Sequence, residues 1–403
     1  MTYPAGTPED KPEPLKGMRV LDLSRFIAGP LCGQLLGDMG AEVIKLERPG
    51  GEDARQLGPF VDGMSLYVMS YNRNKLGMTL DTRSPQALGI LEELVAHSDV
   101  LVENYRPGTL EKMGIGHERL RQINPRLVVT SLSGFGQTGP MAGRALFDAI
   151  AQAMSGLMTL TGEPEDPPTM AGAFIADYLT GVFGALGTTT ALLHRERTGT
   201  GQVVDVGSLD VLFSSLGTAP SAYANLGRQS RRTGSRDELS GPANLFQTSD
   251  GWVYMHAGTN PLFRRLCGLI GAPELAEGEW GTIAGRMADI EAVEDCVQQW
   301  LSSLTTDQVA ELLEEAAIPF GPALTVPEVV ELPQLAARQM LVPVPHTGIG
   351  EVTLTGMPVK LSESPGVIRR GAPQVGEHNS YVYQELLSRS DEEFVALRQA
   401  GVV

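Results

Sequence analysis

The chain has 403 residues, of which 42% are hydrophobic, and its 48 Asp and Glu residues against 31 Lys and Arg give a net charge of −17. So acidic a surface disfavours nucleic acid or an anionic membrane as the main partner, although it leaves room for a local basic pocket. No apolar run approaches the ~20 residues of a membrane span, and the polar, Pro-rich residues 1–17 lack the apolar core of a signal peptide. We expect two or three domains, or one large α/β unit with an insertion, and no membrane anchor.

The cysteines and histidines carry little functional signal. Cys32, Cys267 and Cys296 are widely spaced and form no Cys-x-x-Cys pair. We interpret them as reduced thiols and expect a cytoplasmic protein. The six histidines never fall at the spacing of metal ligands, so no metal site is expected.

A βαβ unit opens the predicted fold. Residues 20–23 read as a buried strand, a helix follows from about 31 to 39, and residues 41–46 form the next strand. The intervening turn offers only Ala28-Gly29-Pro30 in place of Gly-x-Gly-x-x-Gly. This argues against a dinucleotide whose pyrophosphate rests on that turn.

Strands and helices then alternate, which predicts a doubly wound, mostly parallel sheet. Arg48, Lys75 and Arg106 lie just past its strands or in its loops, where open α/β sheets bind ligands. Each could be an ordinary solvated charge, but their shared placement on an acidic chain favours a polyphosphate pocket. The expected strands are 78–81, 100–103 and 127–132, with helices at 85–98 and 116–123.

Asp177 stands alone in an apolar stretch, with residues 171–176 before it and 179–192 after it. The apolar spacing from Tyr178 on predicts a helix that runs to His194 and Arg195. An Asp at such a start is a common N-cap, which the helix terminus holds ionised. A carboxylate held ionised among apolar residues is also a potential nucleophile. The residues alone favour the cap over the nucleophile.

The second half of the chain changes composition at residues 227–241, a polar and Arg-rich stretch that marks the first domain boundary. Before it, a strand at 202–206 leads into one long apolar helix at 209–226. Beyond it, a hairpin at 244–255 turns at Ser249-Asp250-Gly251. The remaining expected elements are helices at 260–270, 290–303, 306–317 and 326–332, strands within 342–361, and a last helix at 380–387.

Many short strings in this chain, in order, resemble the family III CoA-transferases, the formyl-CoA, carnitine-CoA and bile-acid-CoA transferase group. The resemblance extends from Leu15 to about Leu387, and so many strings together make it highly specific. The first strings are L-K-G-M-R-V-L-D-L-S, A-G-P-x-C and G-A-E-V-I-K-L-E-R-P. The others are N-R-N-K, E-N-Y-R-P-G, N-P-R-L-V, S-G-F-G-Q-T-G-P, D-A-I-A-Q-A-M-S-G, A-F-I-A-D, D-G-W-V-Y, I-P-F-G-P and G-E-H.

The resemblance implies that Asp177 is the catalytic carboxylate and so decides between cap and nucleophile. It implies an α/β fold with a Rossmann-like, mostly parallel large domain, a smaller α+β domain, and an interlocked homodimer of ring-like subunits. The expected divisions are a flexible tail at 1–16, a large CoA-binding domain at 17–226, a linker and small domain at 227–340, and a segment at 341–403 that returns to complete the large domain. The implied CoA contacts are Ala28, Arg48, Lys75, Asn104, Tyr105, Lys112 and Met113.

The implied reaction moves coenzyme A from an acyl-CoA thioester to a carboxylic acid through a mixed anhydride and an aspartyl-CoA thioester on Asp177. Its expected partners are an acyl-CoA, a small carboxylic acid and a second copy of the chain, without nucleic acid or membrane. Coenzyme A is then a substrate, and no tightly bound cofactor or metal is expected. Transfer between two carboxyls of one dicarboxylic acid would use the same residues and stays open.

The main rival is a 2-methylacyl-CoA racemase, which needs a His facing the Asp as a second acid/base group. No His lies between His117 and His194, and the matching position is Phe147, which argues against a racemase. A CoA-binding protein without catalysis would not need Asp177.

Three departures from the formyl-CoA:oxalate members bear on the substrate. Arg25 and Ile27 replace a His and a Gln in the first turn, Ser133 and Phe135 match polar residues near the acyl group, and residues 235–244 replace a glycine-run loop. Oxalate and formate are therefore doubtful substrates. Arg25, Ile27 and Phe135 are candidate substrate residues, and Arg25 could bind an acceptor carboxylate or form a surface or structural pair.

Overall fold

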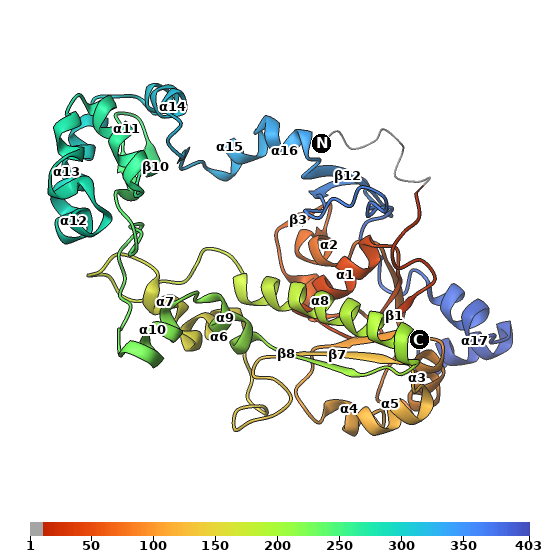
Figure 1. The fold of residues 1–403 in the computed structure, drawn as a ribbon. Helices are drawn as coiled ribbons and strands as arrows, with labels where there is room; N and C mark the ends of the chain where they lie inside the picture. Colours follow the sequence, from red (N-terminus) through yellow and green to blue (C-terminus); the bar gives the residue numbers. More distant parts are fainter. Residues whose placement is uncertain (1–10) are drawn as a thin grey trace. The chain divides into compact units, whose positions relative to one another are not determined.

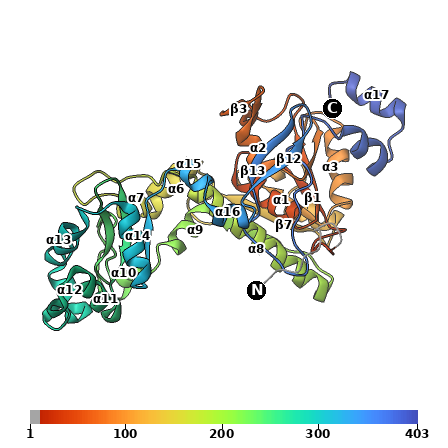
Figure 2. The same ribbon diagram turned by 90° about the horizontal axis from the view of Figure 1, so that it is seen from above.

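The computed structural model describes residues 11–403, so most of the tail expected at 1–16 lies outside the described residues. The described chain divides into two compact units. The first unit contains residues 11–157, 171–220 and 333–403, and the second contains 158–170 and 221–332. Figures 1 and 2 show the elements of both units from two directions.

A six-stranded sheet forms the centre of the first unit, and every neighbouring pair in it is parallel. Its order is β5-β2-β1-β6-β7-β8. The order therefore reverses between β1 and β6, as in doubly wound nucleotide-binding sheets. The expected α/β fold with a large, mostly parallel sheet is confirmed. The strands are β1 (Arg19–Asp22), β2 (Glu42–Glu47), β5 (Lys75–Thr79), β6 (Val100–Glu103), β7 (Val128–Ser133) and β8 (Val203–Gly207).

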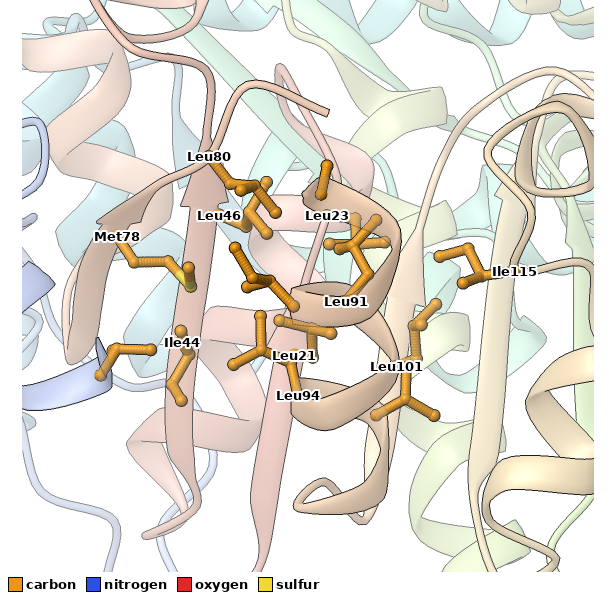
Figure 3. Packing of buried hydrophobic residues seen from close by; sticks show 14 of the residues in the cluster. Leu21, Leu23, Ile44, Leu46, Met78, Leu80, Leu91, Leu94, Leu101 and Ile115 are labelled. Carbon is orange, nitrogen blue, oxygen red and sulfur yellow. The ribbon is translucent and has the colours of Figure 1, made fainter. Parts of the chain in front are cut away.

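Alternate residues of each strand face opposite sides of this sheet, and both sides are covered. Val20 and Val43 pack with α1 (Ala28–Asp38) and α8 (Ile175–Thr198) in one core. Leu21 and Ile44 pack with α3 (Ala87–Ala96) in another. Figure 3 shows this second core, where leucines of the strands meet those of the helix. Burial on both faces explains the continuous apolar runs of these strands.

The remaining helices of the first unit are mostly short. They are α2 (Leu66–Asn72), α4 (Thr109–Lys112), α5 (His117–Ile123), α6 (Asp148–Ser155), α9 (Ser208–Ser215), α16 (Pro333–Ala337) and α17 (Asp391–Gln399). Two antiparallel hairpins complete the unit, β3 (Phe60–Val61) with β4 (Met64–Ser65), and β12 (Leu341–His346) with β13 (Gly350–Thr355).

The second unit has its own core around a three-stranded antiparallel sheet of order β11-β10-β9. The hairpin expected at 244–255 is β9 (Ala243–Gln247) and β10 (Trp252–His256), joined by β11 (Phe320–Pro322). Its helices include α11 (Asn260–Ile270), α12 (Ile283–Ala288), α13 (Ile290–Leu301), α14 (Thr306–Glu315) and α15 (Val326–Val330), and most of α7 (Leu157–Leu160) belongs to it as well.

Two expected helices are wrong in extent. The single helix expected at 209–226 is two helices, α9 and α10 (Ala219–Leu226). Gly217 between them has a φ of +63°, and Pro220 lacks the N–H that a continuous helix requires. Near the C-terminus, the expected helix at 380–387 is a π-helical turn, Tyr381–Leu386, and α17 follows it. Ser390 and Glu393 form a capping box at the start of α17, a signal that the sequence contained.

Candidate active site

A cavity of about 760 Å³ opens in the first unit beside Asp177. It lies at the carboxyl ends of β1 and β6, where the strand order reverses and where open α/β sheets bind ligands. Its wall is built from loops that follow five strands and from the segment before α6. These wall segments lie within residues 23–28, 45–52, 80–83, 104–113, 133–134 and 142–147.

Asp177 does not cap the helix that carries it. It is the third residue of α8, and the N-cap position is Phe174, whose side chain makes no capping hydrogen bond. The carboxylate of Asp148 takes that role instead, because its Oδ2 accepts the backbone N–H groups of Ala176 at 2.7 Å and Asp177 at 3.1 Å. The interpretation of Asp177 as an N-cap is therefore wrong, because its carboxylate does not cap α8.

Gln152 fixes Asp148 and the approach to α8 together. Its Nε2 donates to Asp148 Oδ1 at 2.5 Å and to the carbonyl of Ala173 at 3.2 Å, and its Oε1 accepts the N–H of Ala171 at 3.0 Å. Both side chains belong to the D-A-I-A-Q string at the start of α6 and are buried. This string thus holds the backbone on which Asp177 is mounted.

Burial, and then the negative charge of Asp148, raise the pKa of Asp177 to about 7. Burial, and then the nearby charge of Asp177, raise the pKa values of Tyr67 and Tyr71 on α2. Tyr67 packs edge-on against Phe174 with ring centres 6.4 Å apart and against Tyr71 at 5.6 Å. The expectation that the helix terminus holds Asp177 ionised is wrong, because Asp148 already occupies the first N–H groups. An ionised Asp177 is therefore a more basic, more nucleophilic carboxylate than an ordinary one.

The turn after β1 is held next to Asp177 by two contacts. Gly181 lies one helical turn beyond Asp177, and a Cβ atom there would stand 2.7 Å from the carbonyl of Ala28, so α1 and α8 approach closely. Phe26, in the same turn, packs edge-on against Phe147, whose ring centre is 5.9 Å away and whose neighbour is Asp148. The φ of Phe26 is +66°, a strained conformation for an aromatic residue of the kind found at functional sites.

Two hydrogen bonds connect Arg25, in the loop after β1, with Asn104, in the loop after β6. The N–H of Arg25 donates to Asn104 Oδ1 at 2.8 Å, and Asn104 Nδ2 donates to the carbonyl of Arg25 at 2.7 Å. The Arg25 guanidinium lies 5.7 Å from the centre of the Tyr105 ring. The structure thus brings three of the candidate residues together on the cavity wall, with Ala28 beside them.

The other candidates divide into those on the wall and those away from it. Arg48, Met113 and Ile27 line the cavity, whereas Lys112 is exposed on α4 outside it. Phe135 is buried behind the wall, and its ring centre lies 5.8 Å from the guanidinium of Arg144, which does line the cavity.

Lys75 is fully buried and does not reach the cavity. Its Nζ donates to Asp22 Oδ2 at 2.7 Å, to the carbonyl of Pro30 at 2.8 Å and to Asn72 Oδ1 at 2.9 Å. Burial lowers the pKa of Lys75 to about 8. A direct contact between Lys75 and a ligand in this cavity would require Nζ to leave all three partners.

Reasoning from the sequence missed Asp148, Gln152 and Phe26 as parts of the site. Asp148 and Gln152 stood in a quoted string, but nothing in their spacing indicates that they would serve a helix more than 20 residues later. Across residues 11–403 there is no group of three or more His, Cys, Asp or Glu residues placed to hold a metal ion. Over the same range no helix is long and apolar enough to cross a membrane.

Comparison with known proteins gives consistent matches along the chain. A family model described as CoA-transferase family III matches residues 15–379. The chain is 37% identical over 396 residues to succinyl-CoA–D-citramalate CoA-transferase of Chloroflexus aurantiacus, covering 97% of this chain and 98% of the relative. It is 40% identical over 397 residues to the beta subunit of succinyl-CoA–L-malate CoA-transferase of the same organism, with 97% and 98% covered. A solved structure of a CAIB/BAIF family protein from Brucella suis superposes with a TM-score of 0.82 and 34% identity, covering 93% of this chain and 99% of that one.

Proposed function

The chain belongs to CoA-transferase family III and is a CoA-transferase, and we propose that it moves coenzyme A through covalent intermediates on Asp177. The observation that carries this proposal is the state of the Asp177 carboxylate. It lies in the cavity formed by the loops after β1 and β6, where the strand order reverses. Asp148 caps α8 in its place, and the pKa of Asp177 is raised to about 7. No basic side chain is among the groups that shift this pKa.

The reaction balances without metal or redox chemistry by the protein. Asp177 Oδ attacks the thioester carbonyl, the C–S bond breaks, and coenzyme A leaves as a thiolate from a mixed anhydride. The thiolate then attacks the Asp177 carbonyl and releases the donor acid, which leaves an aspartyl-CoA thioester. The acceptor carboxylate attacks this thioester, forming a second anhydride, and the thiolate attacks the acceptor carbonyl to give the new acyl-CoA and free Asp177.

We assign the phosphate-bearing part of coenzyme A to the cationic wall of the cavity. Five arginines line it, namely Arg25, Arg48, Arg83, Arg106 and Arg144. Arg48 is hydrogen-bonded to Asp53 and to the carbonyl of Gly51, and Arg83 is paired with Asp81. On so acidic a chain, this concentration of guanidinium groups supports the proposed polyphosphate pocket. Asn104, Tyr105, Ala28 and Met113 complete the proposed CoA contacts on the same wall.

Arg25 is the proposed partner of a substrate carboxylate. In the described part of the chain its guanidinium contacts the ring of Tyr105 but forms no ion pair, and its backbone is fixed by Asn104. The two relatives described above act, by their names, with succinyl-CoA on D-citramalate or L-malate. Dicarboxylic acids and succinyl-CoA are therefore the first substrates to try, and transfer within one dicarboxylic acid remains the alternative within this function.

We also propose that the protein is a homodimer and that it is located in the cytoplasm. Large apolar side chains on one chain's α8, including Tyr178, Phe183 and Leu186, are exposed, which supports a partner surface there and the proposed interlocked homodimer. All three cysteines are free, in keeping with a reducing compartment.

The proposed function is tested by incubating purified protein with a panel of acyl-CoAs and acids and following exchange by mass spectrometry. The panel should pair succinyl-CoA with dicarboxylic acids and with monocarboxylic acids of equal length. Wild-type protein should exchange CoA with at least one pair, and Asp177→Asn should not. Exchange by the Asn variant at the wild-type rate would refute the covalent route.

A further inference from the structure

The hydroxyl of Ser133 is buried on the cavity wall without a partner. Ser133 is the last residue of β7 and is 9% exposed. Its Oγ is buried and forms no hydrogen bond with any described residue, and Ser133 is one of the residues that line the cavity beside Asp177. A buried hydroxyl without a partner is unfavourable, and buried polar groups in folded proteins are nearly always paired. An exception at a ligand cavity points to a partner that arrives with the ligand.

The other buried polar atoms without a partner do not offer the same chemistry. Seven such side-chain atoms occur among the described residues, and only those of Glu52 and Ser133 belong to the cavity wall. Glu52 Oε1 lies 3.4 Å from Lys45 Nζ, so it has an ionic partner, and as a carboxylate oxygen it cannot donate when ionised. Among the described residues, Ser133 Oγ is therefore the buried hydrogen-bond donor of this wall that lacks a partner.

The backbone of Ser133 is tied to the helix that carries Asp177. Ser208 Oγ, at the start of α9, donates to the carbonyl of Ser133 at 3.4 Å. Thr180 Oγ1 donates to Ser208 Oγ at 3.1 Å, and Thr180 lies on α8 less than one turn beyond Asp177. This chain of hydrogen bonds fixes the position of the end of β7 relative to the first turn of α8.

Three backbone donors near the site are already in use. The N–H groups of Ala176 and Asp177 bind Asp148, and the N–H of Gln137, in the glycine-rich loop after β7, binds both carboxylate oxygens of Asp205. A thioester carbonyl attacked by Asp177 still needs a donor where its oxygen becomes an oxyanion. Among the described residues, the Ser133 hydroxyl is the one buried side-chain donor of the wall that has no partner.

We propose that Ser133 is a catalytic residue whose Oγ donates a hydrogen bond to the carbonyl oxygen of the bound thioester as that oxygen becomes an oxyanion. This inference rests on the proposed function of Asp177. The same donor serves each carbonyl that Asp177 and the thiolate attack in turn. Because the hydroxyl is unpaired in the free enzyme, it is ready for this contact without first breaking another.

The test compares Ser133→Ala with Ser131→Ala. Ser131 lies two residues earlier on β7 and is also buried, but it does not line the cavity. Its hydroxyl is hydrogen-bonded to His117 Nε2 at 3.4 Å and to Glu103. Loss of one oxyanion donor lowers kcat by roughly 10²–10³-fold in well-studied enzymes. We expect a fall of about that size for Ser133→Ala, a KM for the acyl-CoA within about twofold of wild type, and kcat close to wild type for Ser131→Ala.

Thermal stability separates this role from a structural one. Removing an unpaired buried hydroxyl should leave the Tm of Ser133→Ala equal to or above that of wild type, while Ser131→Ala, which loses a paired hydroxyl, should have a lower Tm. Ser133→Thr, which keeps a hydroxyl, should recover part of kcat. A kcat for Ser133→Ala near wild type, or a parallel fall in kcat and Tm, would overturn the proposal. Asp177→Asn is assayed beside these variants. If it is inactive while Ser133→Ala fails to behave as expected, only the role of Ser133 is refuted. If Asp177→Asn is active, the proposed function itself is refuted.

Discussion

Asp148 Oδ2 accepts the backbone N–H of Asp177 at 3.1 Å, so one carboxylate caps the helix on which the other is mounted. Burial, and then the negative charge of this cap, raise the pKa of Asp177. Two neighbouring acids thereby take two roles, one as the cap of α8 and the other as the proposed nucleophile.

Asp148→Asn should separate the charge of the cap from its hydrogen bonds. Asn can keep an acceptor oxygen for Ala176 and Asp177, but it loses the hydrogen bond from Gln152 Nε2 and removes the negative charge. The pKa of Asp177 should therefore fall. The acid limb of the kcat/KM profile should then move to lower pH. Asp148→Ala should in addition lower the free energy of unfolding by about 1–2 kcal/mol, because buried N–H groups lose their partner. A profile for the Asn variant that coincides with wild type would contradict the electrostatic role of Asp148.

The pH dependence of the wild-type enzyme follows from the ionisation of Asp177. In the proposed mechanism only the ionised carboxylate of Asp177 attacks, so kcat/KM should rise with pH and level off above a pKa of about 7. Glu103 is the necessary control, because burial raises its pKa to about 7 as well. Glu103→Gln should keep the acid limb. Loss of the limb in that variant would assign the titration to Glu103 instead.

The ionisation of Asp177 should affect the stability of the fold in the opposite direction to its effect on activity, because the protonated carboxyl favours folding. The pKa of Asp177 is raised from 3.8 to about 7 in the folded protein, so between these values the folded state binds more protons than the unfolded state. This group therefore favours folding at low pH and loses that contribution as pH rises through 7. Asp177→Asn, which cannot ionise, should raise Tm relative to wild type more at pH 8 than at pH 5. Equal effects at both pH values would argue against the raised pKa.

Arg48 and Lys75 should respond differently to replacement by Ala. Arg48 is exposed on the cavity wall, so Arg48→Ala should raise KM for every CoA ester by a similar factor, corresponding to roughly 1.5–3 kcal/mol for one charged hydrogen bond. Lys75→Ala would leave Asp22 buried without its cation and should lower the free energy of unfolding by about 3–5 kcal/mol. Denaturant unfolding and steady-state kinetics on both variants test this. A Lys75→Ala variant of normal stability with a raised KM would restore Lys75 as a direct ligand.

The proposed interlocked dimer makes a prediction about dilution. Interlocked rings cannot separate unless one of them opens, so dissociation should require unfolding of part of a subunit. Mass photometry at nanomolar concentration should give twice 43.1 kDa. A folded monomer in equilibrium with dimer under those conditions would rule out interlocking.

Elements with a strong local signal were predictable from the sequence, whereas long-range partners were not. Residues 100–103 are β6 and residues 260–270 are α11, as expected, because apolar runs and capping residues define both locally. The break at Gly217 was missed because apolar periodicity continues across it. Asp177 was identified through family resemblance, but the prediction that it caps its own helix was wrong. The residue that caps this helix, Asp148, lies 29 residues away in the chain, so no local pattern indicates it. From the sequence, Lys75 was predicted to contribute to a polyphosphate pocket, and only the fold reveals Asp22 beside it.

The central claim is that coenzyme A and the acyl group pass through Asp177, and trapping tests it most directly. Enzyme should be incubated with succinyl-CoA and no acceptor, then treated with hydroxylamine and digested. Hydroxylamine converts an anhydride or thioester of Asp177 to a hydroxamate, so peptide mass spectrometry should find the modification on Asp177, and Asp148 in the same sample should remain unmodified. Asp177→Asn should give no hydroxamate while still binding CoA. A turning-over enzyme whose Asp177 is never modified, or an Asn variant with wild-type turnover, would contradict the account.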